Sequence, residues 1–242
     1  MVLHKNVREA AQLTLDFDHR PALGGDDFLV AAPNADAVRW LDSWPDWPGP
    51  ALVIYGAAGS GKTHLAQVFL AKSMAKVVTA GDLLDSQPPV YVGEEPAAVL
   101  EDVDLLVGPS AASPDLEEAV LHLYNHLGET GRHLMLTAKQ PPARWGIGLA
   151  DLASRLNMAT QAGIGPPDDG LITAVLVKQF ADRQLKIDDG VISFMLARME
   201  RSFDAARRMV AAIDDQALKR HRNITVALVR QVLQTDFQSE DE

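Results

Sequence analysis

The sequence predicts an α/β fold, in which a parallel sheet flanked by helices is followed by an all-helical domain. Two observations support this prediction. Residues 23–165 alternate between short apolar runs and helical patterns, as parallel sheets covered by helices do. Residues 166–237 show only helical patterns, and they follow a break in structure expected at the glycine- and proline-rich segment 163–167. We therefore expect a leader over residues 1–22, an α/β domain over 23–165 and a helical domain over 166–237.

Local patterns predict the individual elements of both domains. Apolar runs between turn residues indicate strands, expected over residues 51–55, 76–80, 97–100 and 133–137. Amphipathic spacing indicates helices in the α/β domain, expected over residues 34–41, 62–74 and 115–128. The same spacing predicts the helices of the second domain, over residues 172–183, 188–199, 203–220 and 225–234. Asp188 stands where helix starts favour carboxylates, and Thr225 can cap the last helix.

Composition excludes several classes of function. The 242 residues include no cysteine, which rules out disulfides, thiol catalysis and cysteine-ligated zinc. The net charge of −11 is too acidic for tight binding to duplex DNA, whose phosphates need a basic surface. No apolar run reaches the roughly 18 residues of a membrane span, and the first residues lack the apolar core of a signal peptide. We expect a cytoplasmic protein that contacts no membrane and reaches DNA only through another protein.

A complete phosphate-binding motif, Gly56-Ala-Ala-Gly-Ser-Gly-Lys-Thr63, lies between a predicted strand and a predicted helix. Glycines let backbone N–H groups surround phosphate oxygens, and the start of the following helix attracts their negative charge. Lys62 is expected to reach the β- and γ-phosphates, and the Thr63 hydroxyl is expected to coordinate Mg²⁺. An ordinary glycine turn is the alternative. The predicted nucleotide-binding residues are Gly56, Ala57, Ala58, Gly59, Ser60, Gly61, Lys62, Thr63 and His64.

Acidic residues follow the strand predicted over 97–100 and are candidate partners of this motif. A carboxylate at such a position holds Mg²⁺ or orients the attacking water. We assign Glu101 to the metal and Asp102 to catalysis, although Asp is the usual residue at the first position and Glu moves the carboxylate by about one methylene. A solvated acidic turn is the alternative. Thr137 is a further catalytic candidate, because a hydroxyl at a strand end can contact the γ-phosphate or water.

Several segments together resemble one known family. They are the phosphate-binding motif, the acids at 101–102, Thr137-Ala-Lys-Gln-Pro-Pro142 and Leu149-Ala-Asp-Leu-Ala-Ser-Arg-Leu156. They are similar to the AAA+ module of DnaA-related replication proteins, and more closely to the Hda family of truncated regulators, over roughly residues 10–236. The resemblance implies a AAA+ P-loop NTPase fold with a helical lid, ADP or ATP with Mg²⁺ as the ligand, and no counterpart of the initiator's C-terminal DNA-binding domain.

The leader contains Gln12-Leu-Thr-Leu-Asp-Phe17, which is similar to the clamp-binding peptide of the Hda family. Its alternation of polar and apolar residues also fits an edge strand whose apolar side chains face a core. The resemblance implies binding to the sliding clamp, the β subunit of DNA polymerase III. Two apolar anchors would enter a pocket while the Gln12 amide makes directional hydrogen bonds. The predicted clamp-binding residues are Gln12, Leu13, Leu15 and Phe17.

Arg155 occupies the position of the family's arginine finger. There the resemblance implies a planar cation that neutralises charge at the γ-phosphate of a neighbouring subunit, whereas an ordinary surface arginine is the alternative. The lid departs from the family pattern, because Asp204 stands where a phosphate-contacting arginine is usual. Arg207 and Arg208 are the candidates that replace it. Together with Glu101, this departure indicates weak or no ATP hydrolysis by the chain itself.

The resemblance implies a regulatory function. A AAA+ protein of this kind binds DnaA and the clamp, stimulates hydrolysis of DnaA-bound ATP and so prevents over-initiation of replication; it is also expected to self-associate. An ATP-driven remodeller similar to a helicase loader is the alternative, in which the chain's own ATP turnover does the work. A small-molecule P-loop kinase fits less well, because helices follow the sheet and no acceptor site is evident.

Overall fold

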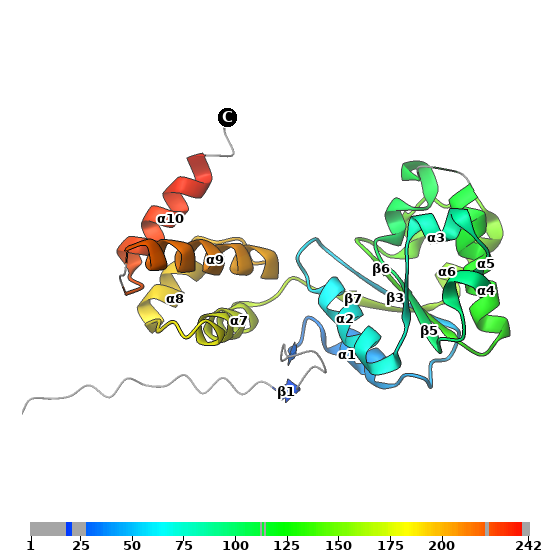
Figure 1. Cartoon of the computed structure of the whole chain (residues 1–242), viewed down its shortest axis with the longest axis horizontal. Helices are drawn as coiled ribbons and strands as arrows, with labels where there is room; N and C mark the ends of the chain where they lie inside the picture. The colour runs from blue at the N-terminus through cyan, green and yellow to red at the C-terminus, as the bar shows by residue number, and fades with distance from the viewer. Residues whose placement is uncertain (1–17, 21–27, 112, 114, 221–222, 239–242) are drawn as a thin grey trace, which may run out of the picture.

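The computed structural model describes residues 18–20, 28–111, 113, 115–220 and 223–238. It contains a parallel five-stranded sheet with helices on both faces, and beside it a group of four helices that follows in the sequence (Figure 1). The peptide 12–17, predicted to bind the clamp, lies outside the described residues. Among the described residues, no helix is both long and apolar enough to cross a membrane.

All strand pairs of the main sheet are parallel, and the strand order is β4-β5-β6-β3-β7. The strands are β3 (Ala51–Gly56), β4 (Lys76–Val78), β5 (Ala97–Leu100), β6 (His133–Ala138) and β7 (Thr160–Ile164). Successive side chains of β3 enter opposite cores, with Val53 on one face and Leu52 and Ile54 on the other. Because both faces are covered, the central strands are continuous apolar runs in the sequence.

Helices cover the two faces of this sheet unequally. One core contains residues of α1 (Ala35–Asp42) and α2 (Lys62–Ser73). The other core contains residues of α3 (Ala80–Asp85), α4 (Pro88–Val92), α5 (Asp115–Glu129) and α6 (Ala150–Met158). Short 3₁₀ turns complete this region, namely η1 (Val103–Leu105), η2 (Gly108–Ser110) and η3 (Pro142–Arg144).

The helical part has a hydrophobic core of its own. It consists of α7 (Asp169–Asp182), α8 (Asp189–Leu196), α9 (Phe203–Arg220) and α10 (Val226–Gln238). Phe180, Met195 and Ile213, from three of these helices, are fully buried in that core. The predicted cap of the last helix is confirmed, because the Leu228 N–H donates to Thr225 Oγ1 at 3.3 Å.

A short antiparallel hairpin links the two parts. It consists of β1 (Asp18–Arg20) and β2 (Phe28–Val30). Leu29 of β2 is buried against Leu171 and Ala174 of α7. The hairpin thereby places a strand from the start of the described chain against the first helix of the helical part.

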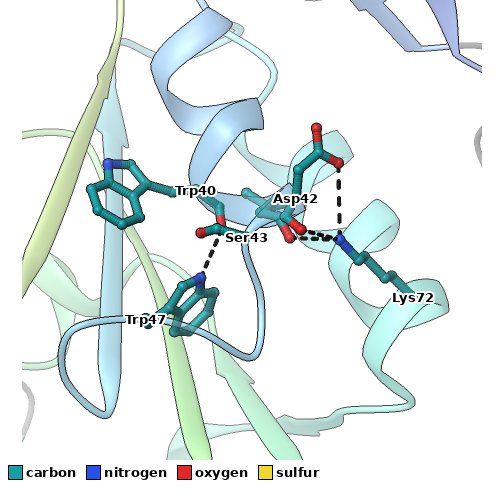
Figure 2. Close-up of polar contacts among 6 residues, drawn as sticks. Trp40, Asp42, Ser43, Trp47 and Lys72 are labelled. Atoms are coloured by element: carbon teal, nitrogen blue, oxygen red, sulfur yellow. Dashed lines mark hydrogen bonds and ion pairs between the residues drawn. The ribbon is translucent and has the colours of Figure 1, made fainter.

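The connection from α1 to β3 fixes α1 against α2 at the end of the sheet where β3 begins (Figure 2). Lys72 Nζ donates to the carbonyl oxygens of Leu41 and Asp42, both at 2.9 Å, and so satisfies the C-terminal end of α1. Trp47 stacks on Phe69 of α2, and its indole N–H donates to the Trp40 carbonyl at 2.7 Å. These contacts hold α2, whose other end starts at the phosphate-binding loop.

The predicted fold class is confirmed, but two local predictions are wrong. The strand predicted over 76–80 ends at Val78, because Thr79 and Asp82 form a reciprocal capping box that starts α3. The break predicted over 163–167 begins later than expected, since β7 continues to Ile164. This strand, Thr-Gln-Ala-Gly-Ile, lacks an apolar run and pairs along β3 at the edge of the sheet.

Candidate functional site

The loop between β3 and α2 has the backbone of a phosphate-binding site. Gly59 and Gly61 have φ angles of 70° and 99°, in the left-handed region that favours glycine. A Cβ on Gly56 would lie only 2.7 Å from the Ile164 carbonyl oxygen. The glycines therefore allow a tight turn that leads directly into the N-terminus of α2, as an anion site requires.

Lys62, the first residue of α2, folds its side chain back over this loop. Its Nζ donates to the carbonyl oxygens of Gly56 and Ala57 at 2.8 and 2.9 Å. Burial lowers the pKa of Lys62, and the charges of Asp102 and Asp104 oppose this change. The ammonium group is thus held inside the loop that is predicted to receive the phosphates.

A cleft of about 720 Å³ opens between this loop and the helical part. Its volume lies in the range of small-molecule sites. The predicted nucleotide-binding residues that line it are Ala58, Gly59, Gly61, Lys62, Thr63 and His64. Of the other predicted residues, Gly56 and Ala57 hold Lys62, and Ser60 is buried within the loop.

The side of the cleft formed by β2, α7 and α9 includes an apolar wall, and charged residues of α7 and α9 line the cleft beside it. Leu29, Leu171, Val175 and Phe203 line this side of the cleft, and they come from β2, α7 and α9. A flat base fits against such a wall, while the loop supplies N–H groups for phosphates. The cleft therefore combines the two kinds of surface that a nucleotide requires.

The acidic residues lie at the ends of neighbouring strands. The Asp102 N–H donates to Thr137 Oγ1 at 3.0 Å, which ties the ends of β5 and β6 together. Asp102 lines the cleft, whereas Glu101 and Thr137 are not among its lining residues. Thr137 is only 1% exposed, and its buried hydroxyl holds the backbone of Asp102. The roles assigned to Glu101, Asp102 and Thr137 stay predictions.

The N-terminus of α9 contacts the phosphate-binding loop directly. The Phe203 N–H donates to the Gly59 carbonyl at 3.1 Å, and a Cβ on Gly61 would lie 3.2 Å from the Phe203 ring. Asp204 follows and forms ion pairs with both Arg207 and Arg208. Arg207 lines the cleft, whereas Arg208 is not among its lining residues. Their predicted contact with phosphate stays a prediction.

Arg155 lies on α6, on an exposed surface outside this cleft. Its side chain is 40% exposed, and its Nε lies 3.1 Å from Asp151 Oδ1 one helical turn earlier. The guanidinium carbon is 5.8 Å from the centre of the Tyr124 ring. Exposed pairs of this kind contribute little to stability, so the guanidinium can exchange Asp151 for another anion.

Sequence reasoning missed Glu117 of α5, which holds the start of α6. Its carboxylate accepts three backbone N–H groups, from Gly108 at 2.8 Å, Gly148 at 3.0 Å and Leu149 at 2.6 Å. Leu149 is the N-cap residue of α6. Burial acts to raise the pKa of Glu117, but the three donors outweigh it, and the pKa lies below its usual value. Glu117 thus positions the helix that carries Arg155.

We expect Glu117→Gln to lower the free energy of unfolding by about 1–2 kcal/mol near neutral pH, because an amide accepts these N–H groups less strongly than a carboxylate does. Since the pKa of Glu117 is lowered by folding, its contribution is complete above the unfolded-state pKa of about 4.3. It is lost as the pH falls through the lower folded-state value. Urea unfolding of the wild type and of Glu117→Gln, between about pH 3 and pH 8, measures this difference.

The matched control for this prediction is Glu118→Gln, one position along the same helix turn, where the side chain is exposed. Glu118→Gln removes the same charge from α5 without touching the start of α6. Equal stability changes for the two variants, or a difference that does not shrink in acid, would contradict the assigned role of Glu117.

Comparison with known proteins places this arrangement among AAA+ domains. Residues 169–233 match the family described as "Hda, lid domain". Domain III of the Thermotoga maritima replication initiation protein DnaA is similar in structure, with a TM-score of 0.71 and 19% identity over 86% of this chain and 94% of that chain. AMPPCP-bound DnaA from Aquifex aeolicus has a TM-score of 0.62 and 19% identity, over 77% of this chain and 63% of that one.

A more distant AAA+ structure shares the same fold. The AAA domain of FIGL-1 in complex with ADP has a TM-score of 0.58 and 14% identity, over 78% of this chain and 72% of that chain. At these identities the similarities establish the fold, and they confirm the expected AAA+ architecture with a helical lid. The matched family region begins at Asp169, the first residue of α7, and extends into α10.

Proposed function

We propose that this chain, which has the fold of AAA+ domains and matches the Hda lid family over residues 169–233, stimulates hydrolysis of the ATP bound to DnaA, and so switches the initiator off and prevents over-initiation. The observation that carries this proposal is the position of Arg155, which is exposed and lies outside the chain's own nucleotide cleft. A planar cation on an outer surface suits the γ-phosphate of a neighbouring AAA+ subunit. DnaA itself is the proposed neighbour.

The cleft of this chain binds ADP or ATP in the proposal. The phosphate-binding loop and the apolar wall support it, and two structural neighbours hold AMPPCP and ADP. Thr63 and Asp102 line the same cleft and provide the hydroxyl and carboxylate oxygens that Mg²⁺ prefers. Mg²⁺, when bound, would neutralise charge on the phosphates, and Thr63 and Glu101, the predicted metal ligands, would hold it together with Asp102.

The leader is proposed to attach the chain to the sliding clamp. The peptide 12–17 directly precedes β1 in the sequence. A net charge of −11 disfavours direct binding to DNA, so attachment through a clamp loaded on DNA gives this acidic chain access to the initiator. Gln12, Leu15 and Phe17 would supply most of the affinity.

Phe17→Ala or Gln12→Ala is expected to weaken clamp binding by about 2 kcal/mol or more, the usual loss at a central anchor of an interface. The melting temperature should not change, because only interface contacts are removed. Fluorescence anisotropy with purified clamp measures the affinity, and Thr14→Ala, between the anchors, is the control. Unchanged affinity would remove this peptide from the proposal, and a large fall in melting temperature would favour the edge-strand alternative.

Single-turnover hydrolysis of ATP preloaded on DnaA tests the proposed function as a whole. We expect acceleration when both this protein and DNA-loaded clamp are present, and little with either alone. No acceleration under any condition would contradict the proposal. Acceleration that tracks this chain's own ATP turnover would favour an ATP-driven remodeller instead.

A further inference from the structure

We propose that the outer side of the helical part binds an acidic segment of a partner protein through Arg198, Arg230 and the ring of Phe194, which together we call the arginine patch. Phe194 belongs to α8, Arg198 follows the end of that helix, and Arg230 belongs to α10. Both helices lie on the side of the helical part that faces away from the sheet (Figure 1). None of the three residues lines the nucleotide cleft, so the inference is independent of the nucleotide binding proposed above.

The two arginines of the patch lie over the same aromatic ring. The guanidinium carbon of Arg198 is 3.8 Å from the centre of the Phe194 ring, and that of Arg230 is 5.6 Å from it. A cation within about 6 Å of a ring centre is attracted by the electrons of the ring. The Arg198 guanidinium also donates to the Phe194 carbonyl at 3.3 Å, and the Arg198 backbone N–H donates to the Met195 carbonyl at 2.9 Å. These contacts order the cations before a ligand arrives, which lowers the entropy cost of binding.

The positive charges of the patch are not neutralised by the residues that the structure describes. Both arginines are exposed, and within that part of the chain neither forms an ion pair with a carboxylate. Six other cations of the helical part do pair with an aspartate, namely Lys178, Arg183, Arg201, Arg207, Arg208 and Lys219. A guanidinium that lies over a ring keeps its planar edge of N–H donors for a further ligand. The patch therefore presents two neighbouring cations to a ligand from outside.

The helical part differs in charge from the rest of the chain. Residues 169–238 contain 11 lysines and arginines and 9 aspartates and glutamates, a net charge of +2, whereas the whole chain has a net charge of −11. An acidic ligand is thus repelled by most of the chain and attracted to the helical part. Because salt screens exposed charges beyond about 10 Å, the local charges of the patch decide where such a ligand docks.

Carboxylates fit the patch better than nucleic acid does. An arginine can bind a carboxylate through two parallel N–H bonds. The two guanidinium groups are less than about 10 Å apart, since both lie over one ring. Two acidic residues separated by one residue in an extended segment are about 7 Å apart and point to the same side, so they can meet both cations. Nucleic acid would need a broader basic surface than two arginines on an acidic chain provide.

Fluorescence anisotropy of a labelled peptide of alternating Glu and Ser, titrated with the full chain, tests this inference. We expect the affinity to fall about tenfold in Arg198→Ala and in Arg230→Ala, because each variant loses one hydrogen-bonded charge pair with the peptide. A peptide with Gln in place of Glu should not bind. The matched control is Lys219→Ala, which removes the same charge from α9, where Asp215 already pairs with the lysine. It should bind the acidic peptide like the wild type.

Two further measurements separate loss of the patch from loss of the fold. Since both arginine side chains are exposed, the two variants should melt like the wild type and keep its affinity for ADP. Unchanged peptide affinity in both variants, equal binding of the Gln peptide, or no binding by the wild type would overturn the inference. Binding of single-stranded DNA or of phosphatidylserine vesicles that depends on both arginines, without binding of the peptide, would assign the patch to another ligand and would also overturn it.

Discussion

Arg155→Ala is expected to abolish stimulation of DnaA-bound ATP hydrolysis while leaving clamp binding and nucleotide binding by this chain intact. Arg155 lies outside the chain's own cleft, its ion pair with Asp151 is exposed, and its guanidinium covers the outer side of the Tyr124 ring, which is 9% exposed. Its removal should therefore cost little stability. Arginine fingers accelerate phosphoryl transfer by about 10³–10⁵, so the loss should be visible even where the effect is weaker.

Single-turnover hydrolysis of ATP on DnaA, with clamp and DNA present, measures the effect of Arg155→Ala. Arg155→Lys should also fail, because an ammonium group lacks the planar fork that contacts two phosphate oxygens at once. The matched control is Arg144→Ala, which removes an exposed arginine from η3, close in sequence to α6. Full stimulation by Arg155→Ala would refute the arginine-finger assignment.

Lys62→Ala is expected to remove nucleotide binding, with a loss of about 3 kcal/mol or more, in the range found when one member of a buried charge pair is truncated. Lys62 is only 8% exposed, and its ammonium group donates hydrogen bonds to the Gly56 and Ala57 carbonyls of the loop. Glu101→Ala should have a milder effect, because Glu101 does not line the cleft and would act only through the metal.

Titration with a fluorescent adenine nucleotide measures both affinities. Circular dichroism melting confirms that Lys62→Ala is folded. The control Lys72→Ala removes a lysine at the other end of the same helix, which contacts the Leu41 and Asp42 carbonyls and the Asp42 carboxylate rather than the loop. Equal nucleotide affinity for the wild type and Lys62→Ala would contradict the phosphate-loop assignment. If Lys62→Ala lost both its own ATP turnover and its stimulation of DnaA-bound ATP hydrolysis, the result would favour the ATP-driven remodeller.

The elements that sequence predicted well are those whose signal is local. β5 matches its prediction residue for residue, because an apolar run between turns needs no distant partner to be recognised. The phosphate-binding loop is equally local, since its glycines and Lys62 are adjacent in the chain. The edge strand β7 was not predicted, because its residues are small and polar and only pairing with β3 makes them a strand.

Residues whose role depends on distant backbone groups could not be predicted. Glu117 looks like any exposed acid at a helix start, and two of its partners are the N–H groups of Gly148 and Leu149. Lys139 lies in the segment 137–142 that resembles the family, but its place in the cleft follows from the register between β3 and β6. The sequence did indicate that Asp204 is unusual, but the ion pairs it forms with Arg207 and Arg208 required the structure.

The contact between Phe203 and the phosphate-binding loop couples the orientation of α9 to the shape of the loop. This helix of 18 residues is about 27 Å long, and its first residue is the one bonded to Gly59. Each degree by which the loop turns Phe203 about that end moves the far end of α9 by about 0.5 Å. A protein that touches only the distal surface of the lid would therefore sense the shape of the loop without approaching the nucleotide.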